Sequence, residues 1–340
     1  MKYSKLVIKI AVIIIFAGTI MAFIGYVMGG KTNIKSSGLY ISTKNVNHII
    51  KNEELGEFNN VDIDVNLDYI ELIKSDKNKI ELNYSEDLNK VDYKIDNNNL
   101  TIKQESKKLV DININLFGFM EENKSYMKLY ISESELENIK INSNYTDIKI
   151  EGVSGNVVNI KCDYANLDVD NLNGKSGNIS MKDGNIDLSN IKIEDTFELK
   201  NSYGNIGISN SQFQNLISNI NDGNIEILNS IIKNSKITND YGNINLVDSY
   251  SEGINIYCKD GRVELDGSFR GYTTIDNKYG NVELDLDNYE KEYGYSIVNK
   301  YGSIKINDVS MEGSIINNNN SENTINVNCT DGNININFEK

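Results

Sequence analysis

Three stretches decide the fold because they repeat one motif: INDGNIEI (residues 220–227), ITNDYGNINL (237–246) and YCKDGRVEL (257–265). In each of them a Tyr or an Asp stands before Gly, and apolar residues follow at two-residue spacing. We take that Tyr or Asp as position zero of a unit. Ten units are visible, with position zero at Tyr145, Tyr164, Asp183, Tyr203, Asp222, Tyr241, Asp260, Tyr279, Tyr301 and Asp331. The steps are 19 or 20 residues, apart from one of 22 and one of 30 near the end.

Apolar columns run through the repeat. Every unit has Ile, Leu or Val three residues after position zero and again five residues after it. Four residues before position zero the column is also apolar, and Ser218 is its one exception. Apolar residues two apart mark a strand with one buried face, and a fixed period means that each unit repeats the same path. The sequence therefore predicts an all-β fold, a β-solenoid of stacked parallel strands.

The sequence is compatible with two coil lengths, 19 residues and 38 residues. Tyr203, Tyr241 and Tyr279 are 38 residues apart, so one coil could hold 38 residues with Tyr and Asp corners on opposite sides. Coils near 20 residues are the commoner size, so we predict coils of about 19 residues. Neighbouring strands lie about 4.8 Å apart, so the distance between Gly204 and Gly223 decides between the two.

A glycine follows position zero in eight units. It allows a positive φ without a Cβ penalty, which suits the corner of a coil. We interpret these residues as structural turn glycines: Gly184, Gly204, Gly223, Gly242, Gly261, Gly280, Gly302 and Gly332. The chain has no Pro to interrupt the strands between the corners.

The N-terminal segment has the pattern of a membrane anchor. Residues 10–30 carry no charged side chain and are long enough to cross about 30 Å of hydrocarbon as a helix. An uncleaved anchor is favoured over a signal peptide by this length, although cleavage stays open. Lys2, Lys5 and Lys9 place the N-terminus in the cytoplasm. We predict a cytoplasmic tail (1–9), one transmembrane helix (10–30), a juxtamembrane linker (31–57) and an extracytoplasmic β-solenoid (58–340), with N-terminal coils and cap (58–140) before the regular repeats (141–340).

The net charge and the positions of the cysteines and aspartates argue against several partners, a disulfide and a shared metal ion. The net charge of −15 argues against nucleic acid or an anionic lipid surface. The cysteines share one column, two residues before position zero, and stacked coils would put Cys162 about 24 Å from Cys258 and Cys258 about 14 Å from Cys329. A disulfide is therefore excluded. Likewise Asp183, Asp222 and Asp260 would lie two coils apart, too far to share Ca²⁺. We predict no metal, cofactor or catalytic residue.

The order of these segments resembles a bacterial family of β-strand-repeat domains of unknown function, described as putative adhesins and related to auto-transporter adhesin head domains. The resemblance lies in YVMGG (26–30), YIELIKSDKNKIELNY (69–84), NNNLTIK (97–103), KLYISESELENIKINSNYTDIKIEGVSG (128–155) and the GNI units. It covers nearly the whole chain. It implies a right-handed parallel β-helix held at the cell envelope, without an established activity. The chain departs from the family pattern at Ser132, where Pro is common, and in its regular alternation of Tyr with Asp.

The side chain at position zero has two possible roles, packing between coils or binding a partner. The residue two before it is apolar where position zero is Asp and is Asn where position zero is Tyr, from Tyr203 onward. Such an exchange is typical of close packing, and aromatic residues tend to be buried, so packed corners are the expected outcome. The alternative is an exposed candidate binding surface for an envelope protein or a glycan, made of Tyr203, Tyr241, Tyr279 and Tyr301. Exposure of these residues distinguishes the two.

We therefore predict a binding or scaffolding module at the bacterial envelope, adhesin-like or associated with envelope stress, rather than an enzyme. The alternative is an enzyme that acts on cell-surface polysaccharide. Its side chains would come from the one charged neighbourhood of both signs, Asp260, Arg262, Glu264, Asp266 and Arg270. The oligomeric state is not predicted.

The C-terminal end raises one further expectation. Residues 287–295 and 308–325 lengthen the last steps and predict loops between coils, where recognition often occurs. The final strand, NININF (333–338), should then form an open sheet edge that needs a partner or a cover.

Overall fold

The computed structural model describes residues 11, 14–21, 24, 27, 33–37, 40–42, 48–85, 89–106, 111–115, 124–132, 135–317 and 321–339. The chain divides into two compact units. Unit 1 is made of Met1–Ile49, Ser85–Lys90 and Glu105–Asn123, and unit 2 of Ile50–Tyr84, Val91–Gln104 and Lys124–Lys340. Residues 117–123 (FGFMEEN), which interrupt the strand pattern of the sequence and predict a loop, lie outside the described residues.

Unit 1 contains helical residues and a small antiparallel sheet. Its strands are β1 (Asn33–Ser37), β2 (Tyr40–Ser42) and β9 (Asp111–Asn115), in the order β2-β1-β9. Part of the segment predicted as a linker is thus in strands. Of the predicted membrane helix, only residues 11, 14–21, 24 and 27 are described, and they are helical. Among the residues described, no helix has both the length and the apolar character needed to cross a membrane.

Unit 2 is a stack of strands. Its first strands are β3 (His48–Glu54), β4 (Asn60–Asp64), β5 (Tyr69–Lys74), β6 (Lys79–Ser85), β7 (Asn89–Asp96), β8 (Asn99–Ser106) and β10 (Tyr126–Ile131). The first residues of β3 and β7 and the last residues of β6 and β8 belong to unit 1. The repeats form β11 (Leu136–Ser143), β12 (Asp147–Glu151), β13 (Gly155–Tyr164), β14 (Leu167–Gly174), β15 (Ser176–Asp183), β16 (Ile186–Tyr203), β17 (Ile206–Ser209), β18 (Gln212–Asp222), β19 (Ile225–Leu228), β20 (Ile231–Tyr241), β21 (Ile244–Asp260), β22 (Val263–Tyr279), β23 (Val282–Tyr289), the 3-10 turn η1 (Glu290–Glu292), β24 (Tyr293–Tyr301), β25 (Ile304–Ile306), β26 (Val309–Met311), β27 (Ile315–Asn317), β28 (Asn323–Asp331) and β29 (Ile334–Glu339).

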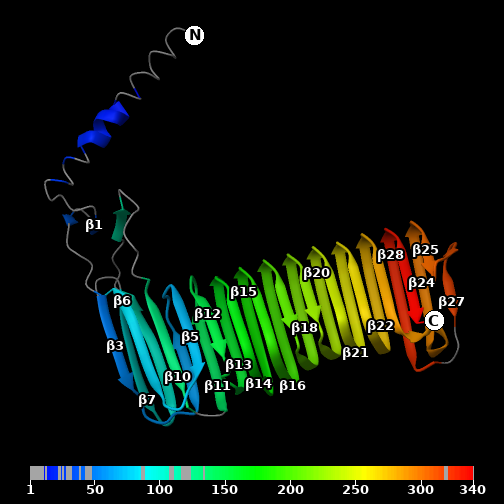
Figure 1. Ribbon diagram of the computed structural model, residues 1–340, viewed down its shortest axis with the longest axis horizontal. Coiled ribbons are helices and arrows are strands. Elements are labelled where there is room, and N and C mark those ends of the chain that lie inside the picture. Colours follow the sequence, from blue (N-terminus) through cyan, green and yellow to red (C-terminus); the bar gives the residue numbers. More distant parts are fainter. Residues whose placement is uncertain are drawn as a thin grey trace, which may run out of the picture. The chain divides into compact units, whose positions relative to one another are not determined.

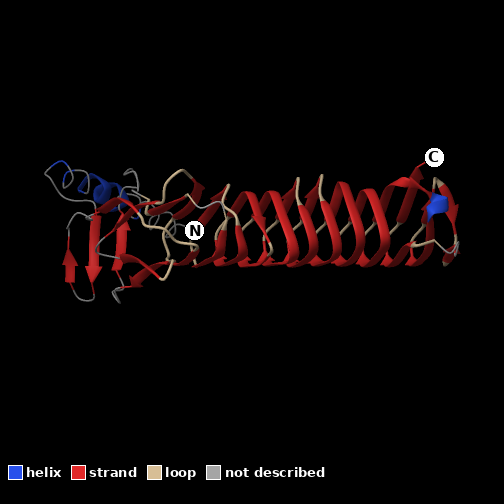
Figure 2. Ribbon diagram, turned by 90° about the horizontal axis from the view of Figure 1, so that it is seen from below, coloured by secondary structure: helices blue, strands red, loops and turns tan. Residues whose placement is uncertain are grey.

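The strand register confirms a coil of about 19 residues. Ile206 pairs with Ile225 in parallel strands β17 and β19, and Ile225 pairs with Ile244 in β19 and β21. Gly223 N–H donates to the carbonyl of Tyr241, one unit further along the chain. The 38-residue alternative is therefore wrong. Figure 2 shows the resulting row of coils, in which strand takes up most of each turn.

The predicted apolar columns form the interior of the stack. Ile206, Ile225 and Ile244 are at most 1% exposed, and the same holds for Leu199 four residues before its corner. Ser218 keeps its place in that column and is buried as well. The inward side chains stack in ladders because every coil repeats the path of its neighbour. Burial of these ladders supplies the main stabilisation of the solenoid.

The corner glycines are required by contact between coils. At Gly223, φ is +144° and an added Cβ would lie 2.0 Å from the carbonyl oxygen of Gly204. Gly261 is the exception among the eight, because its φ is outside the positive range that L-residues avoid. Its Cβ would still lie 2.0 Å from the carbonyl oxygen of Gly242. Glycine is thus required at these corners for two reasons, the close approach of two backbones and, at most of them, the positive φ angle.

An asparagine ladder runs along the outside of the corner, two residues after position zero. Asn224 N–H donates to Oδ1 of Asn205 at 2.9 Å, and Asn243 N–H donates to Oδ1 of Asn224 at 2.8 Å. The same bond recurs through Asn166, Asn185, Asn281 and Asn333. The side chains therefore satisfy backbone N–H groups that the turn leaves without a carbonyl partner. The recurrence of Asn at this column is visible in the sequence, but it does not by itself predict these hydrogen bonds.

The order of the coils differs from the order of the chain at the C-terminal end. Strand β28 pairs with β22 on one side and with β24 on the other, so Cys329 lies between Asn277 and Asn299. Strand β29 is likewise held between β23 and β25. In Figure 1 the red strand β28 lies between strands of earlier residues. The expectation of an open edge at NININF is wrong, because the last strands of the chain form an inner coil.

Short antiparallel strands cover the coil that does lie at this end. β26 pairs with β25 through a tight turn at Asn307 and Asp308, both with positive φ, and β27 pairs with β24. The segment predicted as a loop at 308–325 therefore contains these two strands and the start of β28. Short edge strands are a common means of preventing pairing with other chains.

The N-terminal end of unit 2 has the same kind of insertion. Strand β4 lies between β8 and β11, and β5 lies between β10 and β12. Residues 60–74 thus form the coil next to the first repeat, although some 60 residues separate them along the chain. Strands β8 and β10 lie beyond that coil.

Candidate binding surface

The residues at position zero lie side by side along one corner of the stack, which we call the tyrosine stripe. The register pairs Tyr203 with Asp222, Asp222 with Tyr241, and Tyr241 with Asp260. It continues from Asp260 to Tyr279. Each residue belongs to a different coil, so a straight row forms along the stacking direction.

The inserted C-terminal coil completes the alternation of the stripe. Along the chain, Tyr279 is followed by Tyr301, and the pattern of Tyr then Asp fails. In space, Asp331 pairs with Tyr279 on one side and with Tyr301 on the other. From Asp183 to Tyr301, every Tyr therefore has Asp on its neighbouring coils. The alternation is a property of spatial neighbours that the chain order hides.

The tyrosines of the stripe face solvent. The exposed fraction is 58% for Tyr203, 47% for Tyr241, 51% for Tyr279 and 58% for Tyr301. The packing interpretation of these corners is therefore wrong. A coil corner turns position zero outward while the residue two before it points inward, and the spacing alone did not reveal that.

The interposed aspartates keep the tyrosine rings apart. Where two tyrosines occupy adjacent coils, at Tyr145 and Tyr164, the rings stack with centroids 5.2 Å apart and planes at 9°. Stacked rings cover each other's faces. Tyr241 lies two coils from Tyr203 on one side and two coils from Tyr279 on the other, a distance of about 9.6 Å in each case. No ring in this part of the stripe can therefore stack on the next.

Lysines fix the orientation of two of these rings. Lys259 Nζ lies 4.9 Å from the ring centroid of Tyr241 and donates to its hydroxyl at 3.0 Å. Lys300 Nζ lies 5.0 Å from the centroid of Tyr301. Each is a cation–π contact from the position just before the corner. Such contacts limit the freedom that a ring would lose on binding a ligand.

The inner side of the same corner alternates for a packing reason. Asn239 and Asn277 are fully buried, and Asn239 Nδ2 donates to the carbonyl of Gly223 at 2.8 Å. In the coils between them the place is taken by an apolar side chain such as Cys258, whose Sγ contacts the carbonyl oxygen of Gly242 at 3.6 Å. Burial raises the pKa of the Cys258 thiol to about 11, so the thiol stays protonated.

All three cysteines are free and buried. The predicted separation of Cys258 from Cys329 was wrong in one respect. The inserted C-terminal coil places them two coils apart instead of three, with Asn277 between. At about 9.6 Å they are still too distant for a disulfide.

Comparison with known proteins identifies the family. A family profile described as Toastrack DUF4097 matches residues 58–337, which is most of the chain. The chain belongs to the Toastrack DUF4097 family. This confirms the resemblance to β-strand-repeat domains described as putative adhesins. No significant match is found among curated proteins.

Two solved structures resemble the Toastrack chain. One is described as a putative adhesin from Bacteroides fragilis, with 12% identity, a TM-score of 0.41, and coverage of 85% of this chain and 97% of that one. The other is described as a putative cell adhesion protein from Clostridium sporogenes, with 16% identity, a TM-score of 0.20, and coverage of 87% and 100%. Both scores are low, so the fold assignment rests on the family match and the strand register.

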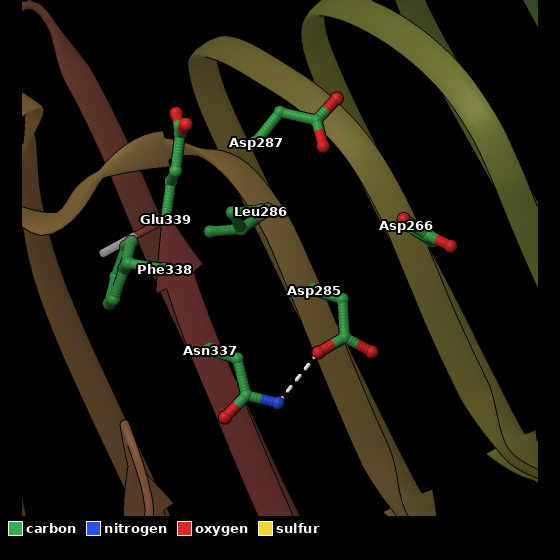
Figure 3. A pocket seen from close by; sticks show the side chains of 7 residues that line it. All are labelled: Asp266, Asp285, Leu286, Asp287, Asn337, Phe338 and Glu339. Atoms are coloured by element: carbon green, nitrogen blue, oxygen red, sulfur yellow. Dashed lines mark hydrogen bonds between the residues drawn. The ribbon is translucent and has the colours of Figure 1, made fainter.

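A second surface feature of the Toastrack domain is an acidic hollow. It has a volume of about 450 Å³ and is lined by Asp266, Asp285, Leu286, Asp287, Asn337, Phe338 and Glu339. Figure 3 shows Asp266, Asp285 and Asn337 on three neighbouring coils, with Asn337 Nδ2 donating to Asp285 at 2.6 Å. Burial, followed by the charges of Asp248 and Asp285, raises the pKa of Asp266. Within the described part of the chain, no group of three or more His, Cys, Asp or Glu side chains could hold a metal ion.

Asp266→Asn is expected to stabilise the Toastrack domain at pH 7 and to have little effect near pH 4. A raised pKa means that the folded state binds the proton more tightly than the unfolded state does. The stability penalty of the charged carboxylate is therefore present above the raised pKa and disappears as pH falls towards the ordinary value. The check is the midpoint of thermal unfolding at both pH values, with a rise of about 2 °C at pH 7. Asp222→Asn, at an exposed corner, is the control, and an equal rise there would contradict the prediction.

The charged residues of the enzyme alternative do not form one group. Arg262 pairs with Glu264 at 3.2 Å and with Glu283 at 2.5 Å. Arg270 lies in the middle of strand β22, eight residues after Arg262, in register with Glu252 of the preceding coil. The Toastrack coil thus separates the two arginines, and Arg262 forms a partly exposed ion-pair network of the ordinary kind.

Proposed function

We propose that this chain is a binding module of the bacterial cell envelope and that the tyrosine stripe is its contact surface. One observation carries the proposal: four tyrosines in a row are about half exposed, with their rings held apart. Solvated aromatic rings of this kind are enriched at binding surfaces, because they offer large contact area at low entropic cost. A stack of coils is also a rigid support for such a row.

The proposal includes an N-terminal membrane anchor with the solenoid outside the cytoplasm. Its support is the uncharged run of residues 10–30 and the exposure of apolar side chains such as Ile14, Phe16 and Met21 on the described helical residues. Exposed apolar surface of this extent is typical of a membrane contact. We further expect the coils to be wound right-handed, as parallel crossovers generally are.

The test is retention of the full chain on lipid-free cell-wall fragments. The chain is kept in detergent micelles and sedimented with the fragments. We expect retention by the unchanged chain and loss of more than half of it when Tyr203, Tyr241 and Tyr279 are replaced by Ser together. Tyr289→Ser is the matched control, because Tyr289 is 42% exposed but lies outside the stripe. Equal retention by all three proteins would show that the stripe is not the contact surface.

A further inference from the structure

We propose that the tyrosine stripe binds an extended β-1,4-linked polysaccharide that lies along the stack of coils. This inference rests on the proposed function and adds the chemical class of the ligand. The part of the stripe from Tyr203 to Tyr301 spans six coil steps, about 29 Å, which is room for an oligosaccharide of several sugars.

The spacing of the rings is the first reason. Like side chains recur at every second coil, a distance of about 9.6 Å. In an extended β-1,4-linked chain, successive sugars are turned by half a turn, so the same sugar face recurs at every second sugar. The length of that disaccharide is close to the distance between two tyrosines. Tyr203, Tyr241, Tyr279 and Tyr301 could therefore each contact the same face of alternate sugars.

The chemistry of the row is the second reason. The C–H groups on one face of a pyranose ring carry slight positive charge, and the face of an aromatic ring is negative. Between the tyrosines lie exposed carboxylates of Asp222, Asp260 and Asp331. Carboxylates accept strong hydrogen bonds from hydroxyl groups, which a sugar offers at every ring. The alternation thus provides a stacking position and then a hydroxyl acceptor along the whole row.

Charge favours an uncharged polysaccharide over a polyanion or a protein. Charges of both signs line the stripe: Lys259 precedes Asp260 in the chain, and Lys300 precedes Tyr301, which pairs with Asp331. The net charge of −15 repels polyanions over a longer range. Binding energy in a protein interface concentrates in a central cluster, whereas here the aromatic residues are spread evenly along a line. A repeating row fits a repeating ligand.

Calorimetric titration with chitohexaose tests the proposal. The full chain is held in micelles of a detergent without a sugar headgroup. We expect the hexasaccharide to bind at least tenfold tighter than chitobiose, and maltohexaose, which is α-1,4-linked and curved, to show no binding. Tyr241→Ala should weaken binding by about tenfold, and Tyr241→Phe by less than about threefold because the ring is kept. Tyr289→Ala should leave the affinity unchanged.

Asp222→Tyr tests the spacing itself. It adds an aromatic ring between Tyr203 and Tyr241, in the arrangement in which Tyr145 and Tyr164 stack on each other. Stacking would cover the ring faces, so we expect binding to fall by at least fivefold. If aromatic area alone mattered, binding would instead rise, and the inference would be overturned.

The outcomes separate the inference from the proposed function. No binding of chitohexaose, together with tyrosine-dependent retention on wall fragments, would overturn the proposed ligand class but not the proposed binding function. No retention on fragments and no binding of chitohexaose would overturn both. Equal binding of chitohexaose and maltohexaose would show that the match to the β-1,4 repeat is wrong.

Discussion

Gly242→Ala is expected to lower the free energy of unfolding by about 4 kcal/mol or more, or to prevent folding of the solenoid. Gly242 has a φ of +126°, which L-residues rarely adopt. An added Cβ would lie 2.1 Å from the carbonyl oxygen of Gly223. The same oxygen accepts the hydrogen bond from Asn239 Nδ2, so it cannot move without breaking a buried contact. The measurement is the urea midpoint of unfolding, followed by circular dichroism.

Gly313→Ala is the matched control for this substitution. Gly313 also has a positive φ, +76°, but no atom lies within 4 Å of the position that its Cβ would take. The change therefore tests the backbone angle without the contact between coils. We expect it to cost about 1 kcal/mol. Similar losses for the two variants would mean that the φ angle, and not the approach of the coils, explains the corner glycines.

Truncation after Asn317 is expected to unfold strands that remain in the chain. It removes β28 and β29, which separate β22 and β23 from β24 and β25. We expect residues 293–306 to lose their protection from amide hydrogen exchange, with exchange rates that rise by two orders of magnitude or more. Direct pairing of β24 with β22 is disfavoured, because it would bring Asn277 against Asn299 in the interior, where Cys329 now separates them.

Truncation after Tyr289 serves as the comparison. It removes β24 and β25 as well and exposes the same edge of β22 and β23. Protection of β22 should therefore be equal in the two truncated chains. If residues 293–306 stayed protected in the longer one, they would pair directly with β22, and the expectation that they depend on the inserted coil would be wrong.

The interior of the solenoid was predictable because the apolar residues that form it recur with a fixed period. Ile225 and Ile227 are buried for the same reason as Ile244 and Leu246, and a period of 19 makes that reason visible in the sequence. The corner glycines were visible for the same reason. The asparagine ladder was equally periodic, but an abundance of Asn throughout the chain hid it.

The surface was less predictable because exposure depends on the path of the backbone. A Tyr at position zero and an Asn two residues earlier have the two-residue spacing of side chains on one face of a strand. The rule fails at the end of strand β20, just before the corner, where the pairing with the next coil omits Asp240 between the two residues. Asn239 is therefore buried while Tyr241 is exposed. The exposed tyrosine stripe follows from this interruption of the pairing, which no alternation pattern shows.

By itself the sequence determined the period, the inward columns, the glycine corners and the separation of the cysteines beyond disulfide reach. Each depends on a single coil and its immediate copy. Only the tertiary structure decided the order of the coils at the two ends. All coils present the same backbone hydrogen bonds to a neighbour, so the period does not say which coil lies next to which. The long segments between Tyr301 and Asp331 let the last coil enter between two earlier ones, and the alternation of Tyr with Asp is complete only in that order.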